Sequence, residues 1–303
     1  MATTQPKTPH AMPDTLEARY AEVQARIADA AARARRKPSD ILLCAVTKTA
    51  DPEQIKGLLQ LGHRDFAENR VQQLIQHASI VEEYLNRQKL IPSGKKLAAD
   101  VNDTLFAAGS SNSKRVELKP VASLPGAKEG VRWHMIGHLQ RNKAKKVTEF
   151  VRLIHSVDSL RIAEELQHIA LKKDHVIEVL IQVNCSGEEQ KFGCPLPAAI
   201  PLAEQIQSMI NVRVRGLMTM APLSEHPEDS RPHFARCREL FEEMQTLGFG
   251  EPGSPFNILS MGMSGDYEVA ISEGANIVRV GSAIFGAAKT GPEQAELPEP
   301  DEE

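Results

Sequence analysis

Short apolar runs alternate with amphipathic segments along most of this chain. Eight runs have the length and residue content typical of strands, at 41–46, 64–68, 131–137, 151–157, 176–184, 212–220, 257–262 and 276–282. Between them, apolar residues at three- and four-residue steps predict helices at about 52–61, 69–85, 140–149, 159–173, 197–210, 230–247 and 265–274. Another helix is predicted before the first strand, because Leu16, Tyr20 and Val23 repeat at this spacing after Asp14, a candidate N-cap.

Strands that alternate with helices pair in parallel, and eight such repeats close into a barrel. We therefore predict an α/β fold, a single (β/α)8 TIM barrel with an extra N-terminal helix. The alternative is an open doubly wound sheet. A glycine-rich turn after the first strand favours that sheet, but the sequence there, AVTKTADP, contains no glycine.

The barrel is predicted to occupy residues 14–288, between a flexible tail at 1–13 and an acidic flexible tail at 289–303. The last residues, GPEQAELPEPDEE, are rich in proline and acid and cannot build a core. Residues 86–130 contain PSGKK, GSSNS and LPGAKEG without sustained periodicity, which predicts a long irregular insertion. A loop of that length inside a compact domain is usually functional or disordered.

The composition restricts the classes of protein and the compartments that fit. The chain has 303 residues and a net charge of -4, and this weak negative charge argues against a nucleic-acid partner. No apolar run approaches the roughly 20 residues of a membrane helix, and the start, MATTQPKTPHAMPD, does not resemble a secretory signal. The four cysteines are widely spaced and predict free thiols in a reducing compartment. We expect a cytoplasmic protein that does not contact a membrane.

Lys48 is the sharpest candidate for chemistry. Functional groups of (β/α)8 barrels lie at the carboxyl ends of the strands, and Lys48 directly follows the apolar run at 41–46. Apolar neighbours would favour the neutral amine, which forms a Schiff base with an aldehyde. A lysine that only marks where a strand meets water explains the position as well, and both interpretations stay open.

The loops after the last two strands read SMGMSGD and VGSAIFG. Phosphate sites in this fold form from the loops after strands 7 and 8. Glycine lets the backbone approach a phosphate, and free N–H groups at a helix start attract anions. Either loop alone is also explained by a tight turn, but the two together predict a phosphorylated ligand.

Arg279 interrupts an otherwise apolar strand, and a buried guanidinium needs a partner. A ring nitrogen or a phosphate of a ligand is one candidate, and a structural ion pair with a carboxylate such as Glu273 is the other. His134 and His138 have the i, i+4 spacing of a zinc pair. They lie on a predicted strand and loop, where that spacing does not converge, so no metal site is predicted.

Taken together, the motifs resemble those of the pyridoxal phosphate homeostasis protein family. The matching segments are AVTKT around Lys48, FAEN ending at Asn69, WHMIGHLQRNK, HSVDS, IQVNCSGEEQKFG, VRGLMTMAP, LSMGMSGDYEVAISEGA and VRVGSAIFG. The resemblance covers about residues 15 to 288. The family's proteins are single-domain relatives of the alanine racemase N-terminal barrel (PLP fold type III) and lack a C-terminal β-domain. This chain departs from the family pattern in having Ala67 in place of glycine and Arg70 in place of tyrosine.

The resemblance implies the cofactor pyridoxal 5′-phosphate (PLP), held as a Schiff base on Lys48. It also implies the remaining cofactor-binding residues, which are Asn69 and His134 on the ring side, Arg279 near the pyridine nitrogen, and Ser260, Met261, Gly262, Ser264, Gly281 and Ser282 around the phosphate. Members of the family resemble carriers or buffers of PLP. We therefore expect a role in intracellular PLP homeostasis without dedicated catalysis, a monomer, and PLP-requiring apoenzymes as candidate partners.

Two other functions remain. A PLP-dependent racemase or decarboxylase needs acid/base groups on both faces of the substrate carbon. Barrel racemases take one of them, a tyrosine, from an added C-terminal domain, whereas Tyr20, Tyr84 and Tyr267 lie at no predicted strand end here. Lys48 acting alone is still compatible with a weak side activity. The second alternative is a barrel enzyme or binding module for another phosphate ligand, with Lys48 as a cation or aldolase-type amine.

Overall fold

The computed structural model describes residues 15–89, 130–188, 190–250 and 255–286. The barrel strands are β1 (Leu42–Val46), β2 (Asp65–Glu68), β3 (Arg132–Met135), β4 (Val151–Val157), β5 (Ile177–Asn184), β7 (Val212–Met218), β8 (Ile258–Ser260) and β9 (Ile277–Val280). The helices are α1 (Leu16–Arg33), α2 (Pro52–Gln60), α3 (Val71–Lys89), α4 (Arg141–Val147), α5 (Leu160–Lys173), α6 (Leu196–Gln207), α7 (Arg231–Thr246), α8 (Tyr267–Ser272) and α9 (Ser282–Phe285).

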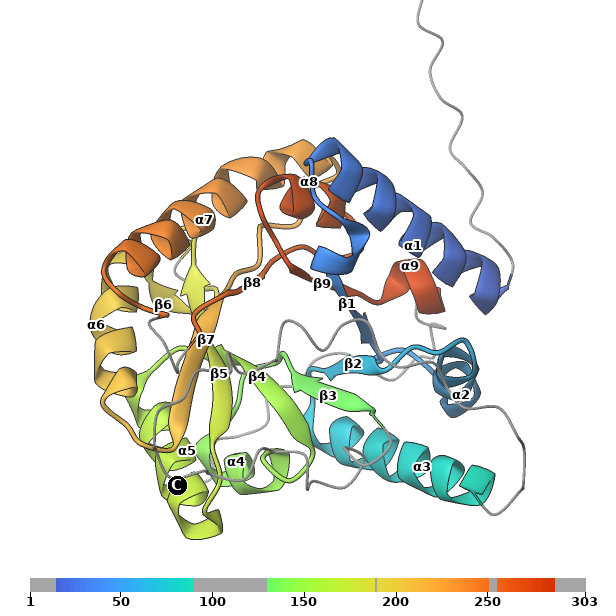
Figure 1. Cartoon of the computed structure of the whole chain (residues 1–303), viewed down its shortest axis with the longest axis horizontal. Coiled ribbons are helices and arrows are strands. Elements are labelled where there is room, and N and C mark those ends of the chain that lie inside the picture. The colour runs from blue at the N-terminus through green and yellow to red at the C-terminus, as the bar shows by residue number, and fades with distance from the viewer. Residues whose placement is uncertain (1–14, 90–129, 189, 251–254, 287–303) are drawn as a thin grey trace, which may run out of the picture.

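The strands pair in the order β4-β3-β2-β1-β9-β8-β7-β5, and β4 also pairs with β5. All these pairings are parallel, so the sheet closes into a barrel with the helices around it (Figure 1). The predicted (β/α)8 barrel is confirmed. A two-residue strand that the apolar pattern did not predict, β6 (Cys194–Pro195), pairs with β5.

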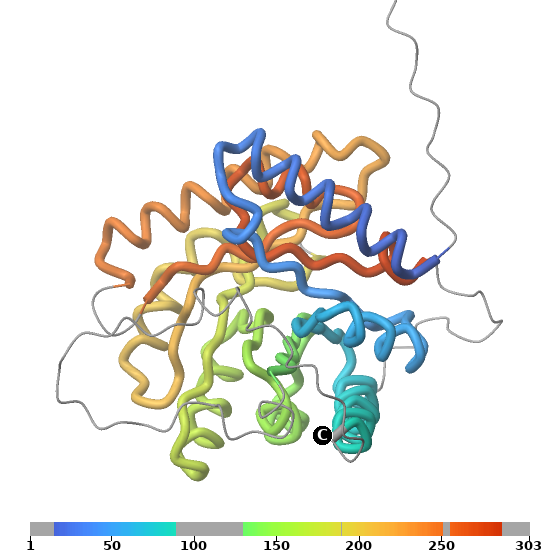
Figure 2. Tube along the Cα trace, turned by 45° about the vertical axis from the view of Figure 1, so that its right-hand side comes forward, coloured from blue at the N-terminus to red at the C-terminus, as the bar shows by residue number. Residues whose placement is uncertain are grey.

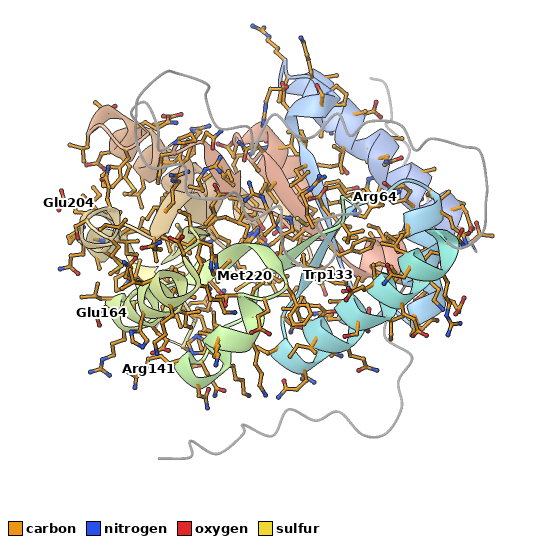
Figure 3. All side chains as sticks on the ribbon, turned by 60° about the horizontal axis from the view of Figure 1, so that its bottom comes forward. Arg64, Trp133, Arg141, Glu164, Glu204 and Met220 are labelled. Carbon is orange, nitrogen blue, oxygen red and sulfur yellow. The ribbon has the colours of Figure 1, made fainter. Side chains whose placement is uncertain are left out.

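The barrel has an inner core and an outer core, because successive side chains of a strand point to opposite faces. The inner cluster consists of Leu42, Cys44, Val46, Ala67, Leu153, Leu180, Met218, Ile258 and Ile277. The alternate strand residues join apolar side chains of the helices in the outer cluster. Burial on both faces explains why these strands read as nearly continuous apolar runs. In Figure 3, Met220 lies near the centre of the view, whereas the exposed charged residues Arg141, Glu164 and Glu204 lie at the periphery.

Helix α1 lies beside the last elements of the barrel, α8 and α9 (Figures 1 and 2). Arg26 and Arg33 form ion pairs with Glu268 at 2.5 and 2.8 Å, and the Arg19 side chain donates to the carbonyl of Ile284 at 2.7 Å. Helix α1 and the last described helices, α8 and α9, are therefore held together by these contacts. Within the described residues, no helix is long and apolar enough to cross a membrane.

Several predicted boundaries differ from the structure. Helix α1 is capped by Thr15, whose hydroxyl accepts from the Ala18 amide at 3.2 Å, and the expected cap, Asp14, lies outside the described residues. Helix α3 extends to Lys89, so the first four residues of the segment expected to be irregular are helical. The rest of that segment up to residue 129, and the tails at 1–14 and 287–303, lie outside the described residues.

Candidate functional site

Lys48 lies at the mouth of the barrel, two residues past the end of β1. Its side chain is exposed, although the preceding Thr47 is fully buried. The chain makes a turn here, in which the Ala50 amide donates to the carbonyl of Thr47 at 3.0 Å. Of the two interpretations of Lys48, the exposed side chain fits a lysine at the point where a strand meets water, since strand β1 ends at Val46 before the lysine is reached.

The backbone that carries Lys48 is fixed from two neighbouring elements. The Thr47 amide donates to the carbonyl of Ala67 at 3.0 Å, and the Thr47 hydroxyl donates to Oε1 of Glu68. The carbonyl of Lys48 accepts from Nε2 of Gln73 on α3 at 3.4 Å. The sequence places Glu68 within the FAEN motif, at the carboxyl end of the predicted strand 64–68, but no role was predicted for it. Its carboxylate anchors the end of β1 from outside the barrel.

Arg279 lies inside the barrel with 2% of its surface exposed. Its Nη1 donates to Oγ of Ser260 at 2.7 Å, and its Nη2 donates to the carbonyl of Thr219 at 2.9 Å. The alternative of an ion pair with Glu273 is wrong, because that carboxylate binds Arg231 and Arg238 at 2.5 and 2.7 Å. Burial lowers the pKa of Arg279 to about 10, so the guanidinium stays charged at neutral pH.

A run of buried polar side chains continues from Arg279 across the barrel. Nδ1 of His155 lies 3.0 Å from Oγ of Ser260, and Nε2 of His155 lies 3.0 Å from Nδ1 of His134. Nε2 of His134 lies 3.3 Å from Oδ1 of Asp65. Asp65 in turn binds Arg132 through both carboxylate oxygens at 2.7 and 2.6 Å. We call this set the interior chain: Arg279, Ser260, His155, His134, Asp65 and Arg132.

The charges of the interior chain follow from burial and from its partners. Burial lowers the pKa of His134, and burial together with the neighbouring His134 and the charge of Arg279 lowers the pKa of His155 well below its ordinary value. For Asp65, burial alone would raise the pKa, but hydrogen bonds from Arg132 and His134 outweigh burial and hold it well below its usual range. Both imidazoles are therefore neutral, and the carboxylate is ionised, at neutral pH.

The two loops predicted to bind phosphate lie together at the carboxyl ends of β8 and β9. Oγ of Ser264 accepts from the backbone amides of Gly281 and Ala283 at 3.2 and 3.3 Å, which joins the loops. Gly262 has φ +89°, and a Cβ at this position would lie 2.6 Å from Cβ of Ala270, so only glycine fits. Ser282, at the start of α9, is exposed.

The other predicted site residues separate into mouth and interior positions. Asn69 is exposed at the end of β2. Gly137 is packed so closely against Asn69 that a Cβ would lie 2.0 Å from the Asn69 carbonyl oxygen. The hydroxyl of Ser260 belongs to the interior chain, whereas the side chain of Met261 lies in the outer core. Only the backbone of Met261 can face a ligand at the mouth.

The two histidines considered as a zinc pair have different partners. His134 lies in the interior chain, whereas His138 lies 3.7 Å from Asp158 and stacks on Phe192 with ring centroids 4.6 Å apart. The interaction with the Asp158 carboxylate raises the pKa of His138. Among the described residues, no group of three or more His, Cys, Asp or Glu side chains could hold a metal ion.

Comparisons with known proteins identify the family. The family model of the alanine racemase N-terminal domain matches residues 19–289. The chain is 36% identical over 271 residues to a pyridoxal phosphate homeostasis protein of Aquifex aeolicus, covering 89% of this chain and 97% of that protein. It is 32% identical over 268 residues to the Escherichia coli K12 protein of the same name, covering 88% and 94%.

Among solved structures, PipY of Synechococcus elongatus, determined with PLP bound, superposes with a TM-score of 0.60 at 28% identity, covering 86% of this chain and 100% of PipY. The resemblance that the motifs indicated is thus confirmed over most of the chain. The chain belongs to the family of the alanine racemase N-terminal domain and, within it, to the group of the pyridoxal phosphate homeostasis proteins.

Proposed function

We propose that this protein binds PLP through Lys48 and serves intracellular PLP homeostasis as a carrier or buffer. One observation carries the proposal: an exposed amine stands at the barrel mouth, while a charged guanidinium is held in the barrel interior by uncharged hydrogen-bond partners. Relatives at 31–36% identity that are named as PLP homeostasis proteins, and the PLP-bound structure of PipY, support this function.

The donor set at the mouth fits a phosphorylated aldehyde. Strand register pairs Cys44 of β1 with Arg279 of β9, so Lys48 follows the strand next to that of Arg279 and lies nearer the carboxyl ends. Gly281 lies beside Val46, where a Cβ would come within 3.1 Å of the Val46 carbonyl oxygen, so a side chain at this position would crowd the end of β1. Hydroxyls and amides of the joined loops surround this point.

Each residue of the proposed site is assigned to one part of the cofactor. PLP supplies an aldehyde that forms a Schiff base with an amine, and Lys48 is the amine placed to provide it. We assign the phosphate to Gly262, Ser264, Gly281 and Ser282, with the backbone of Met261 beside them. Asn69 and His134 lie on the ring side. The hydroxyl of Ser260, which was also expected at the phosphate, serves Arg279 instead.

Arg279 argues for a carrier. An arginine that faces the pyridine nitrogen donates a hydrogen bond to it and disfavours its protonation, which makes the ring a weak electron sink. The described tyrosines do not offer a second acid/base group at the mouth, since Tyr20, Tyr84 and Tyr267 lie on α1, α3 and α8. We therefore propose no dedicated catalysis. A cytoplasmic location, a monomeric state and delivery to PLP-requiring apoenzymes are further parts of this proposal.

Absorption spectroscopy tests the central point. Purified protein supplied with PLP should show a visible band that borohydride abolishes, and the reduced label should stay on Lys48. Lys48→Ala should show neither, whereas Lys145→Ala, which changes an exposed lysine on α4, should behave as the wild type. If the wild type shows no band with added PLP, the proposal fails, and a barrel for another phosphate ligand becomes the better interpretation. If the band is present and the label is on Lys48, amino-acid turnover assays distinguish a carrier from an enzyme.

A further inference from the structure

We propose that His155, supported by His134 and Asp65, is a positioning residue that fixes Arg279 for the cofactor by acting through Ser260. This inference rests on the proposed function, because it concerns the residue assigned to the pyridine nitrogen. The interior chain that carries it draws on five strands, β2, β3, β4, β8 and β9, and every one of its residues except Arg132 is at most 3% exposed.

The hydrogen atoms of the interior chain can be assigned from one end. Asp65 is ionised and can only accept, so Nε2 of His134 carries a proton. Because His134 is neutral, its Nδ1 has no proton and accepts from Nε2 of His155. Burial keeps His155 neutral as well. Since its Nε2 carries the proton that is donated to His134, its Nδ1 has no proton and is an acceptor.

This assignment leaves Ser260 with one possible orientation. Nδ1 of His155 is an acceptor at 3.0 Å, so the serine hydroxyl donates its only proton there. Its oxygen is then turned toward Arg279 as an acceptor for Nη1 at 2.7 Å. All hydrogen bonds from Arg279 to Asp65 thus run in one direction, and the carboxylate at the far end sets that direction.

Two fixed acceptors orient a planar guanidinium. Ser260 holds Nη1, and the carbonyl of Thr219 holds Nη2, so the plane of the Arg279 guanidinium cannot rotate without losing one of them. If His155 is removed, the serine hydroxyl can rotate and point its proton elsewhere. Nη1 then loses an oriented acceptor, although Arg279 and Ser260 are both still present.

The test compares three variants of the full-length protein. His155→Leu removes the acceptor for Ser260. His155→Asn keeps a polar atom on Cγ near the position of Nδ1 but breaks the link to His134. Ser156→Ala is the control, since it changes the next residue of β4, whose buried hydroxyl has no hydrogen-bond partner among the described residues.

Three quantities are measured: the dissociation constant of PLP, the pH at which the absorption band of the lysine-bound cofactor changes, and the melting temperature. His155→Leu should weaken PLP binding about tenfold or more, as expected for a lost hydrogen bond to a charged group, and should shift the pH midpoint of the band. His155→Asn should weaken binding less but still shift the midpoint. Ser156→Ala should change neither.

The pH midpoint separates positioning from packing, because a loss of packing alone lowers the melting temperature without changing the environment of the ring nitrogen. If His155→Leu matches Ser156→Ala in affinity and in midpoint, the inference is wrong, while the borohydride-sensitive band of the wild type still supports the proposed function. If His155→Leu does not fold, His155→Asn decides, and an unshifted midpoint overturns the inference. A wild type without any band overturns both proposals.

Discussion

Replacing Arg279 by methionine tests whether this arginine serves the fold or a ligand. The fall in the pKa of Arg279 from its ordinary value of 12.5 to about 10 corresponds to about 3 kcal/mol that the fold loses by keeping the buried guanidinium charged. A lowered pKa of a cationic group destabilises the folded state at every pH below the folded value, so a measurement at pH 7.5 includes the whole effect. Methionine removes this loss.

Methionine also leaves the carbonyl of Thr219 without its partner, and an unsatisfied buried acceptor costs about 1–3 kcal/mol. The two effects of Arg279→Met oppose each other and are of similar size. We therefore expect the free energy of unfolding of the cofactor-free variant to lie within about 2 kcal/mol of the wild-type value, because Arg279 has no carboxylate partner among the described residues whose charge would be left unpaired.

Arg215 provides the matched control. It is as buried as Arg279, at 2% exposed, but it binds Oε1 of Glu178 at 2.6 Å and Asn257 at 3.0 Å. Arg215→Met takes one of two arginine partners from the buried carboxylate of Glu178, which keeps Arg152 at 3.0 Å, and it also removes a donor from Asn257. We therefore expect a loss toward the lower end of the about 3–5 kcal/mol that breaking a buried pair typically costs. The same substitution at two buried arginines should thus have different consequences.

Urea unfolding of the cofactor-free proteins at pH 7.5 gives the free energies of unfolding. Added PLP should then raise the unfolding midpoint of the wild type and raise it much less for Arg279→Met, because only the wild type offers the guanidinium to the ring nitrogen. A loss of about 3 kcal/mol or more in cofactor-free Arg279→Met, as expected for Arg215→Met, would refute the reasoning and assign Arg279 to the fold.

Two further predictions concern the frame of the site. Gly137→Ala places a Cβ 2.0 Å from the carbonyl oxygen of Asn69 and should cost about 2 kcal/mol or more in urea unfolding, whereas Gly265→Ala, with no atom within 4 Å, should cost less than about 1 kcal/mol. Equal losses would contradict the close approach. Burial alone would raise the pKa of Asp65, but the hydrogen bonds from Arg132 outweigh burial and the net pKa is lowered. The lowered pKa contributes stability above about pH 4, and this stability is lost as the pH falls. Wild-type stability measured from pH 6 to 3 should fall more steeply than that of Asp65→Asn, and parallel curves would contradict this.

The architecture was accessible from the sequence because most of the barrel strands are largely apolar on both faces. The run at 41–46, for example, is buried throughout, and its length distinguishes it from a helix. Strand β6 was missed because two residues have no periodicity, and only backbone pairing with Val183 and Asn184 makes Cys194–Pro195 a strand. The end of α3 was misplaced since the helix continues into residues 86–89, which were assigned to the insertion.

The candidate site was only partly accessible. Strand ends located Lys48 and the two small-residue loops, because the fold brings all carboxyl ends to one mouth. Asp65 and His155 were missed because they lie below the mouth, inside the barrel, where the residues they contact come from distant strands. A polar side chain at an inward position of an otherwise apolar strand is the signal that could have found them. It was used for Arg279, and the same signal is present at His155 in β4.

The two ends of the proposed site differ in solvent exposure, and this difference helps to distinguish a carrier from an enzyme. Catalytic sites exclude water, since exclusion strengthens every electrostatic contact and protects reactive intermediates. Among the described residues, Lys48 has no such cover, because its side chain is exposed while the fixed contacts of that segment are made by its backbone and by Thr47. At the other end, Arg279 is buried and held by two acceptors. A cofactor bound between them would be oriented from the buried end, and its covalent bond would remain open to attack by water or a second amine. Exchange of the cofactor needs a covalent bond that is open to attack, whereas a catalysed reaction protected from water does not.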